Sequence, residues 1–292
     1  MTSRSSSRVT PFLKWAGGKR ALLSEIHQRC PTSYGTYFEP FLGSGAVMFS
    51  LPANQRKIVN DSNGELINAY LALRDDLDGV LHELRKLRNN QLDYVRVRSW
   101  DRLDGFDRLG AAVRAARFVY LNKCGFNGLY RVNSSGFFNV PYGNSPRARF
   151  IDEDVLRNAS RFLRARTKSG HRAISIGTGG YLDSLQHARK GDFVYLDPPY
   201  DPTSKTASFV AYSRNGFGQD DQEQLRDECL RLTKRGVAIL LSNSSTKLIR
   251  GLYADPSIFQ IDKVRVRRAI AAQKSSRRVV DEVLISNRPA LS

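Results

Sequence analysis

Between residues 34 and 61, the segments of this chain follow an order that few folds accommodate. A short β-rich run, Tyr34 to Phe38, leads into the glycine turn Phe41-Leu42-Gly43-Ser44-Gly45, and an apolar segment predicted as a helix follows from Ala46 to Leu51. A second predicted strand, Lys57 to Asn60, stops at Asp61. Strand, glycine turn, helix, strand and acid are the opening of an open α/β sheet whose ligands gather at the strand ends. The sequence therefore predicts the α/β class.

The middle of the chain interrupts this alternation. Helical spacing runs from Gly64 to Asn90 and from Leu109 to Asn122, whereas residues 123–149 have the Gly, Asn, Ser and aromatic content of a loop region that bears a β-hairpin. We therefore predict one sheet domain, residues 1–64 and 151–292, with a mostly helical insert at residues 65–150. The later helices are predicted at Asp154 to Arg166, Asp221 to Lys234 and from about Thr246, and the later strands at Arg172 to Ile176, Phe193 to Leu196, Val237 to Leu241, Ile258 to Val264 and Val279 to Ile285.

Basic residues outnumber acidic ones, and the excess indicates a polyanionic partner. The 46 Lys and Arg against 28 Asp and Glu give a net charge of +18, which favours nucleic acid. A membrane partner is not predicted, because no run of 18 or more apolar residues occurs. Cys30, Cys124, Cys229 and the four histidines lack the spacing of a disulfide framework or zinc site, so we expect reduced thiols, a cytoplasmic protein and no metal.

The motif with the most specific chemistry is Asp197-Pro198-Pro199-Tyr200, which directly follows the predicted buried strand Phe193 to Leu196. An exocyclic amine conjugated to its ring is a poor nucleophile, but two acceptors in fixed positions can draw its hydrogens and free its lone pair. Asp197 supplies one acceptor and the Pro198 carbonyl the other, while the Tyr200 ring offers a face on which a base can stack. The alternative is a strand-ending turn with an ordinary Asp cap.

Two weaker motifs lie nearer the N-terminus. Gly43 and Gly45 let the backbone approach a ligand, and Asp61 can accept hydrogen bonds from a ribose. The lack of a third glycine favours a nucleoside-type ligand without a pyrophosphate, although a glycine turn alone is often only tight packing. In Phe12-Leu13-Lys14-Trp15-Ala16-Gly17-Gly18-Lys19, two lysines around a Trp suit a charged aromatic cofactor or, through Lys14, DNA. The alternative there is a strand with solvated lysines.

Together these motifs resemble the Dam-type DNA adenine-N6 methyltransferases of bacteria and phages, the D12 class. The resemblance implies a Rossmann-like S-adenosylmethionine-dependent methyltransferase sheet with a target-recognition insert. It also implies a monomer that methylates N6 of a flipped adenine in double-stranded DNA, within GATC. Whether a restriction endonuclease accompanies it stays open. The segments that carry the resemblance, in one order from about residue 10 to 286, are Trp15-Ala16-Gly17-Gly18-Lys19, Glu39-Pro40-Phe41 with the glycine turn, Tyr120 to Arg131, Phe138-Asn139-Val140-Pro141 and Asp197-Pro198-Pro199-Tyr200.

The resemblance assigns two sets of residues to the reaction itself. The catalytic turn is formed by the positions that match Asp197, Pro198, Pro199 and Tyr200, and of these Asp197 and Tyr200 face the adenine. The positions assigned to the S-adenosylmethionine pocket are Trp15, Ala16, Lys19, Phe41, Gly43, Gly45, Asp61, Asp183 and Asp197.

Further positions are assigned to DNA. Phe126 is similar to an aromatic wedge that enters the base stack where the adenine leaves. Lys14, Leu129, Arg131 and Pro141 resemble readers of base pairs; an Arg can bond bidentately to guanine, although a phosphate clamp is the alternative for Arg131. The resemblance also assigns Asn127, Asn133, Asn139 and Ser204 to DNA contacts. A late basic cluster is interpreted as a phosphate-binding loop, with a solvated hairpin as the alternative: Lys263, Arg265, Arg267, Arg268, Lys274, Arg277 and Arg278.

Four other functions are weighed against this interpretation. An RNA adenine or a cytosine-N4 methyltransferase shares the scaffold, but Asp at the start of the tetrapeptide favours adenine by resemblance. A non-catalytic DNA-binding protein on the same scaffold would be expected to have lost Asp197 or the glycines at 43 and 45, and all three are present. A nicotinamide oxidoreductase explains neither the tetrapeptide nor the charge.

Overall fold

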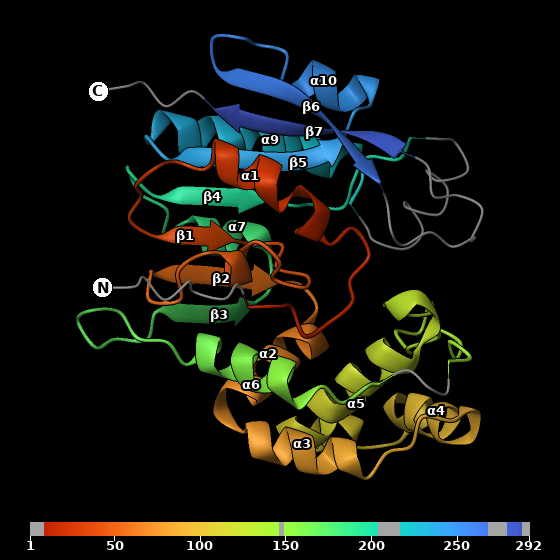
Figure 1. The fold of residues 1–292 in the computed structure, drawn as a ribbon. Coiled ribbons are helices and arrows are strands. Elements are labelled where there is room, and N and C mark those ends of the chain that lie inside the picture. The colour runs from red at the N-terminus through yellow and green to blue at the C-terminus, as the bar shows by residue number, and fades with distance from the viewer. Residues whose placement is uncertain (1–8, 146–148, 204–216, 268–278, 288–292) are drawn as a thin grey trace.

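Seven strands form one sheet in the order β3-β2-β1-β4-β5-β7-β6 in the computed structural model, which describes residues 9–145, 149–203, 217–267 and 279–287 (Figure 1). The first five strands in this order pair in parallel, and β7 is antiparallel to both β5 and β6. The parallel part confirms the predicted α/β class. The strands are β1 (Tyr37–Glu39), β2 (Lys57–Asp61), β3 (Ile174–Thr178), β4 (Phe193–Leu196), β5 (Ala238–Ser244), β6 (Phe259–Arg267) and β7 (Val279–Asn287).

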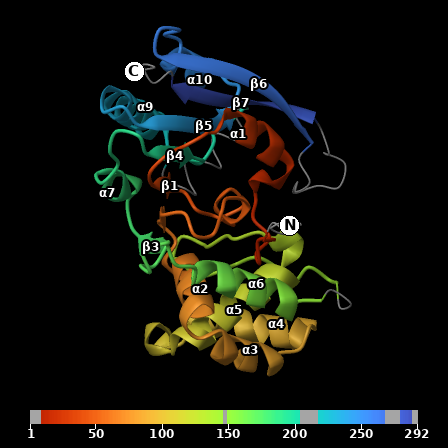
Figure 2. The same cartoon turned by 60° about the vertical axis from the view of Figure 1, so that its left-hand side comes forward.

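Helices cover both faces of the sheet, and a further group of helices lies beyond its β3 edge. Helix α1 (Leu23–Arg29) lies on one face, and α7 (Tyr181–Leu185) and α9 (Gln219–Lys234) lie on the other (Figure 2). The helices beyond β3 are α2 (Gly64–Asp75), α3 (Leu77–Arg85), α4 (Gln91–Arg98), α5 (Ala111–Cys124) and α6 (Glu153–Leu163). Among the described residues, the remaining helical segments are α10 (Lys247–Leu252) and the 3-10 turns η1 (Lys19–Leu22), η2 (Met48–Ser50), η3 (Ser99–Arg102), η4 (Phe106–Arg108) and η5 (Phe126–Gly128).

The prediction of a helix from Ala46 to Leu51 is wrong, because only the short turn η2 forms there. The physical reason is Pro52, because the residue before a proline is restricted to extended backbone. Leu51 has φ −92° and ψ 161°, which ends the turn before a helix can develop. The glycine turn therefore leads directly back into the sheet through a loop.

The region predicted as one helical stretch from Gly64 to Asn90 is two helices. Asp76, with φ −142° and ψ 60°, separates α2 from α3, and its carboxylate accepts a hydrogen bond from Gly79 N at 3.0 Å to cap α3. The helix α4 was not predicted, although Asn90 caps it in the same way by accepting from Asp93 N at 2.9 Å. Short polar caps, rather than apolar spacing, set these boundaries.

The predicted hairpin at 123–149 is present only as a loosely paired loop. Among its described residues, two isolated antiparallel bridges occur, Gly125 with Tyr142 and Val132 with Phe138. Asn133 closes the tip, because its side-chain oxygen accepts from Ser135 N at 3.1 Å and Phe137 N at 2.9 Å. The bridges bring the two sides of the loop together without forming a ladder.

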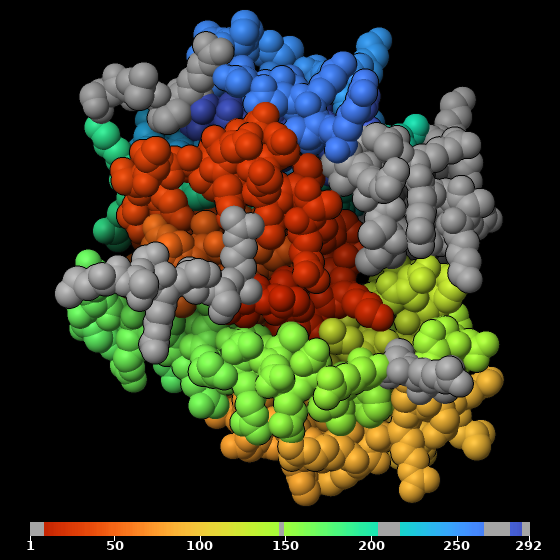
Figure 3. Space-filling model, in the orientation of Figure 1, coloured from red at the N-terminus to blue at the C-terminus, as the bar shows by residue number. Residues whose placement is uncertain are grey.

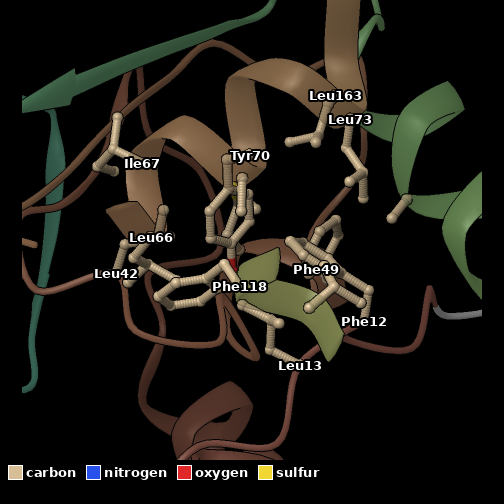
Figure 4. Packing of buried hydrophobic residues seen from close by; sticks show 14 of the residues in the cluster. Phe12, Leu13, Leu42, Phe49, Leu66, Ile67, Tyr70, Leu73, Phe118 and Leu163 are labelled. Carbon is tan, nitrogen blue, oxygen red and sulfur yellow. The ribbon is translucent and has the colours of Figure 1, made fainter. Parts of the chain in front are cut away.

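One hydrophobic cluster runs from the sheet into the helices beyond β3. Figure 4 shows Phe12, Phe49 and Tyr70 packed together within it. The Phe12 and Tyr70 rings meet edge to face with centroids 5.0 Å apart, and the Tyr70 hydroxyl donates to Gly43 O at 3.0 Å. The core therefore fixes the glycine turn directly. A second cluster fills the other face of the sheet beneath α9.

Two acidic or basic side chains are buried in the parallel strands, Glu39 of β1 and Lys57 of β2. Lys57, with no exposed surface, donates from Nζ to Pro52 O at 2.5 Å and Gln55 O at 3.0 Å. The Glu39 carboxyl accepts from the Tyr37 hydroxyl at 2.8 Å and from Met48 N at 3.0 Å. Burial raises the pKa of Glu39 to about 8 and lowers the pKa of Lys57 to about 8. At neutral pH, Glu39 therefore holds a proton that it would release on unfolding.

Replacing Glu39 by Gln is expected to remove one source of pH-dependent stability. The folded pKa of about 8 lies above the ordinary value of 4.5, so the contribution of Glu39 is complete below pH 4.5 and is lost as the pH rises through 8. Urea unfolding at several pH values measures the free energy of unfolding of both proteins. Between pH 4.5 and 8, this free energy should fall in the wild type, relative to Glu39→Gln, by up to about 1.4 kcal/mol per pH unit. Glu25→Gln, at a partly exposed position in a surface ion pair with Arg29, is the matched control. A wild-type minus Glu39→Gln difference that does not vary with pH would contradict the prediction.

Candidate active site

The N-terminal motif, Phe12 to Lys19, runs between the sheet and the helices beyond β3. Figure 3 shows this part of the chain, in red, between the blue strands and the green and orange helices. Asn122 of α5 holds it: Lys14 N donates to Asn122 Oδ1 at 2.9 Å, and Asn122 Nδ2 donates to Lys14 O at 2.7 Å and to Gly128 O at 3.1 Å. Phe12 and Leu13 are buried, while the Lys14 side chain is exposed. The motif is thus anchored by its backbone and presents Lys14 outward.

Asp197 follows β4 at the carboxyl end of the parallel strands, and its contacts fall on one oxygen. Its Oδ1 lies 2.7 Å from Lys19 Nζ and accepts from the Ser242 hydroxyl at 3.0 Å. Among the described residues, no hydrogen bond reaches its Oδ2. Burial raises the pKa of Asp197, and Lys19 and Ser242 oppose that rise. The ion pair with Lys19 thus favours the ionised form of Asp197, which can only accept hydrogen bonds.

Lys19 connects the N-terminal motif to the whole tetrapeptide. Its side chain is only 5% exposed, and Nζ also donates to Gly17 O at 2.5 Å and lies 4.9 Å from the centre of the Tyr200 ring. The Tyr200 hydroxyl donates to Glu282 Oε2 of β7 at 2.9 Å. The predicted residues Lys19, Asp197 and Tyr200 therefore come together as one group.

The glycine turn and Asp61 also come together. Asp61 Oδ2 accepts from Gly43 N at 2.9 Å and Oδ1 accepts from Asn63 N at 3.0 Å, so each oxygen retains capacity for another bond. Gly43 has φ +48°, and a Cβ there would lie 2.8 Å from the Trp15 indole. Only glycine therefore lets Trp15 lie over this turn.

Other residues predicted for the cofactor pocket flank this turn. Phe41 is partly exposed and stacks on Tyr181 with centroids 5.2 Å apart. Asp183 is exposed at the start of α7, beside the Gly179-Gly180 turn, where a Cβ on Gly180 would lie 3.3 Å from its carboxylate. Ala16 is exposed, and Gly45 has φ +64°. Carboxylates with spare lone pairs, exposed rings and a close backbone suit a nucleoside-type group with ribose hydroxyls.

The loop predicted to face DNA presents Phe126 at its surface. Phe126 is 38% exposed, its backbone N donates to Pro141 O at 2.9 Å, and Asn127 after it has φ +54°. Leu129 is partly buried and Pro141 is exposed. A Cβ on Gly128 would collide with the Lys14 side chain, so Lys14 packs against this loop. Lys14, Phe126, Leu129 and Pro141 therefore share one region of the molecule.

Arg131 and Asn139, both predicted to contact DNA, contact each other. Arg131 Nε donates to Asn139 Oδ1 at 2.5 Å, and Nη2 donates to Asn139 O at 3.1 Å. Within the described part of the chain, these bonds use two of the five guanidinium N–H groups and leave three for another partner. Asn133 uses its side-chain oxygen to close the loop tip. The DNA contacts of these three residues stay predictions.

Several residues predicted to contact DNA lie outside the part of the chain that the structure describes. Ser204 lies outside it, as do Arg268, Lys274, Arg277, Arg278 and the side chain of Arg267. Lys263 and Arg265 of β6 are exposed. Within the described ranges, no group of three or more His, Cys, Asp or Glu side chains is placed to hold a metal ion. No helix in those ranges combines the length and apolar character needed to cross a membrane.

Sequence reasoning missed the side chains that support the tetrapeptide. Ser242 and Glu282 come from β5 and β7, and no spacing relates either to Asp197, because the sheet order alone brings them together. Glu39 stands within a recognised motif, so its adjacency to the glycine turn could have identified it. Asn122 likewise lies within the segment Tyr120 to Arg131.

Comparison with known proteins identifies the family of this chain. A family model described as D12 class N6 adenine-specific DNA methyltransferase matches residues 15–270. The type II methyltransferase M1.LlaDCHI of Lactococcus lactis subsp. cremoris is 38% identical, over 98% of this chain and 98% of that protein. The type II methyltransferase M.MjaIII of Methanocaldococcus jannaschii is 36% identical over 96% and 99%, and the DNA adenine methylase of Escherichia coli K12 is 33% identical over 96% of each. The chain therefore belongs to the D12 class of N6 adenine-specific DNA methyltransferases, the family that its motifs resemble.

Proposed function

We propose that this DNA adenine methyltransferase transfers the methyl group of S-adenosylmethionine to N6 of an adenine flipped out of double-stranded DNA, within GATC. The observation that carries the proposal is the Asp197 carboxylate, which Lys19 and Ser242 hold through Oδ1 while no described residue bonds to Oδ2. It stands at the end of a parallel strand, beside the Tyr200 ring. Such a strand end is where ligands bind in open α/β sheets.

Asp197 Oδ2 and the Pro198 carbonyl accept the two N6 hydrogens in this mechanism. As the N6 lone pair attacks the methyl carbon, the carbon–sulfur bond breaks with its electrons on sulfur, which gives S-adenosylhomocysteine, and the N6 proton leaves to water. The acceptors stabilise the positive charge that develops on N6, and Tyr200 holds the ring of the base. Asp197 must be ionised, so activity falls as the pH drops through its pKa, which lies above the ordinary value of 3.8.

The residues around the glycine turn bind the methyl donor in this proposal. Asp61 accepts from the ribose hydroxyls with the lone pairs that Gly43 N and Asn63 N leave. Trp15 and Phe41 provide partly exposed rings for the adenosine moiety. The positive charge of the donor is favoured near the exposed carboxylate of Asp183. The donor then lies at the same strand ends as Asp197, where positioning supplies much of the rate.

The DNA-binding assignment rests on the region shared by Lys14, Phe126, Leu129 and Pro141. A net charge of +18 attracts the phosphate backbone, and the exposed Phe126 ring is available to enter the base stack. Asn139 holds one edge of Arg131, so the other edge is preorganised for the O6 and N7 of a guanine. We assign residues 65–150 to target recognition and residues 1–64 with 151–292 to catalysis, in a monomer.

The site and the modified atom can be determined in one experiment. Genomic DNA from a host without its own DNA methylation, expressing this chain, is sequenced with modified adenines identified by position. N6-methyladenine is expected in GATC and at background level elsewhere. Methylation concentrated in another sequence would refute the GATC assignment and leave the enzymatic class unchanged.

Asp197→Ala is expected to reduce methyl transfer by about 10³-fold, because it removes an acceptor used as charge develops on N6. DNA affinity should change little. Single-turnover transfer from labelled S-adenosylmethionine and DNA binding by anisotropy measure the two quantities. Near wild-type turnover in this variant would refute the mechanism.

Two variants control for this result. Ser242→Ala removes one bond to Oδ1 but leaves Oδ2 in place, so most of the activity should remain. Asp61→Ala should instead raise the dissociation constant of S-adenosylmethionine, because ribose bonds are made in the ground and transition states alike. Calorimetry of S-adenosylmethionine binding separates these two classes of defect.

Arg131→Ala is expected to relax discrimination at one base pair, at a cost of about 1 to 3 kcal/mol on the cognate site. Arg265→Ala, at an exposed position of β6, should weaken binding to all sequences alike and reduce the salt slope by about 1. Titrations at several salt concentrations, on cognate DNA and on DNA with one substituted pair, measure both effects. An equal loss for Arg131→Ala on every sequence would assign Arg131 to phosphate contact instead.

A further inference from the structure

Two buried amide side chains contact the backbone on both sides of Tyr200. Gln222, in the first turn of α9, donates from Nε2 to Pro199 O at 2.9 Å. Asn243 of β5 accepts from Asp201 N through Oδ1 at 3.1 Å. The two amides are joined, because Asn243 Nδ2 donates to Gln222 Oε1 at 3.1 Å. Helix, strand and tetrapeptide thus form one continuous set of hydrogen bonds.

These amides occupy positions where apolar packing would otherwise be expected. Gln222 is 2% exposed and Asn243 is fully buried, and the neighbouring core positions of α9, Leu225 and Cys229, are apolar. A buried amide costs free energy unless its donors and acceptors are used. Both are used here, and the partners include two backbone groups of the segment that begins with the tetrapeptide.

The carbonyls of Pro198 and Pro199 differ in their hydrogen bonds to the rest of the protein. The Pro199 carbonyl is engaged by Gln222. The described residues make no hydrogen bond to the carbonyl of Pro198, the second acceptor of the proposed mechanism. Fixing the Pro199 carbonyl and the Asp201 amide sets the peptide planes on both sides of Tyr200, and rigid prolines transmit this orientation back to Pro198.

We propose that Gln222 and Asn243 are positioning residues for methyl transfer: they hold the backbone of the tetrapeptide so that the Pro198 carbonyl and the Tyr200 ring meet the adenine in the reactive geometry. This rests on the proposed function, because it assumes that the tetrapeptide supplies the acceptors. The proposed mechanism gives neither side chain a contact with the adenine or the methyl donor. A displacement of about 1 Å in a group that positions reactants can cost about 10²-fold in rate.

The test replaces Gln222 by Met, which preserves volume and removes both bonds. The single-turnover rate of methyl transfer is expected to fall by about 10- to 100-fold. The dissociation constants for S-adenosylmethionine and DNA should stay within about threefold, because the residues assigned to binding are untouched. Gln224→Met is the matched control, with the same change at an exposed position of the same helix, and should behave as wild type. Gln222→Leu provides a second variant if Met impairs folding.

Two results would overturn this inference. One is an unchanged single-turnover rate in a folded Gln222→Met or Gln222→Leu enzyme. The other is a parallel loss of rate, ligand affinity and thermal midpoint, which indicates a role in folding alone. Failure of the proposed function has a different signature: Asp197→Ala would retain its activity. The outcomes for Gln222 and Asp197 therefore separate the two proposals.

Discussion

The ion pair between Lys19 and Asp197 is the interaction on which the candidate site depends. It joins the N-terminal motif, anchored to α5 by Asn122, to the end of β4. A buried ammonium without a partner is costly, so the pair constrains both segments. Because Lys19 also lies over the Tyr200 ring, one cation orders both the acceptor and the stacking surface.

Side chains of neighbouring strands hold the residues of this site by further hydrogen bonds. Ser242 of β5 holds the same oxygen of Asp197 as Lys19, and Glu282 of β7 holds the Tyr200 hydroxyl. On the other side, Tyr70 of α2 holds the carbonyl of Gly43, whose amide holds Asp61. The candidate residues for the methyl donor and for the adenine are thus positioned by the same sheet, through different strands. Lys19 and Asp197 are assigned to both sets, whereas the supports of Asp61 and of Tyr200 are separate.

The sequence predicts those parts of the molecule that local patterns encode. Asp197 directly follows the apolar strand β4, and Asp61 is the last residue of β2, so their placement at one edge of the sheet follows from the chain alone. Ser242, Glu282 and Gln222 depend on how distant strands and helices order themselves, and no local spacing encodes that order. The helix predicted at Ala46 to Leu51 does not form, because Pro52 restricts Leu51 to an extended backbone. Local chemistry was therefore predictable, and long-range support was not.

The three hydrogen bonds of Asn122 have a consequence for engineering. They tie Lys14, near the start of the chain, to Gly128 in the loop predicted to face DNA. The surface proposed to read DNA is therefore assembled from two segments that are more than a hundred residues apart. A chimera that exchanges residues 65–150 alone would pair a foreign loop with the original Lys14 segment. A transferable recognition module must include residues 12–19, so its boundaries are set by contacts in space and not by continuity of the chain.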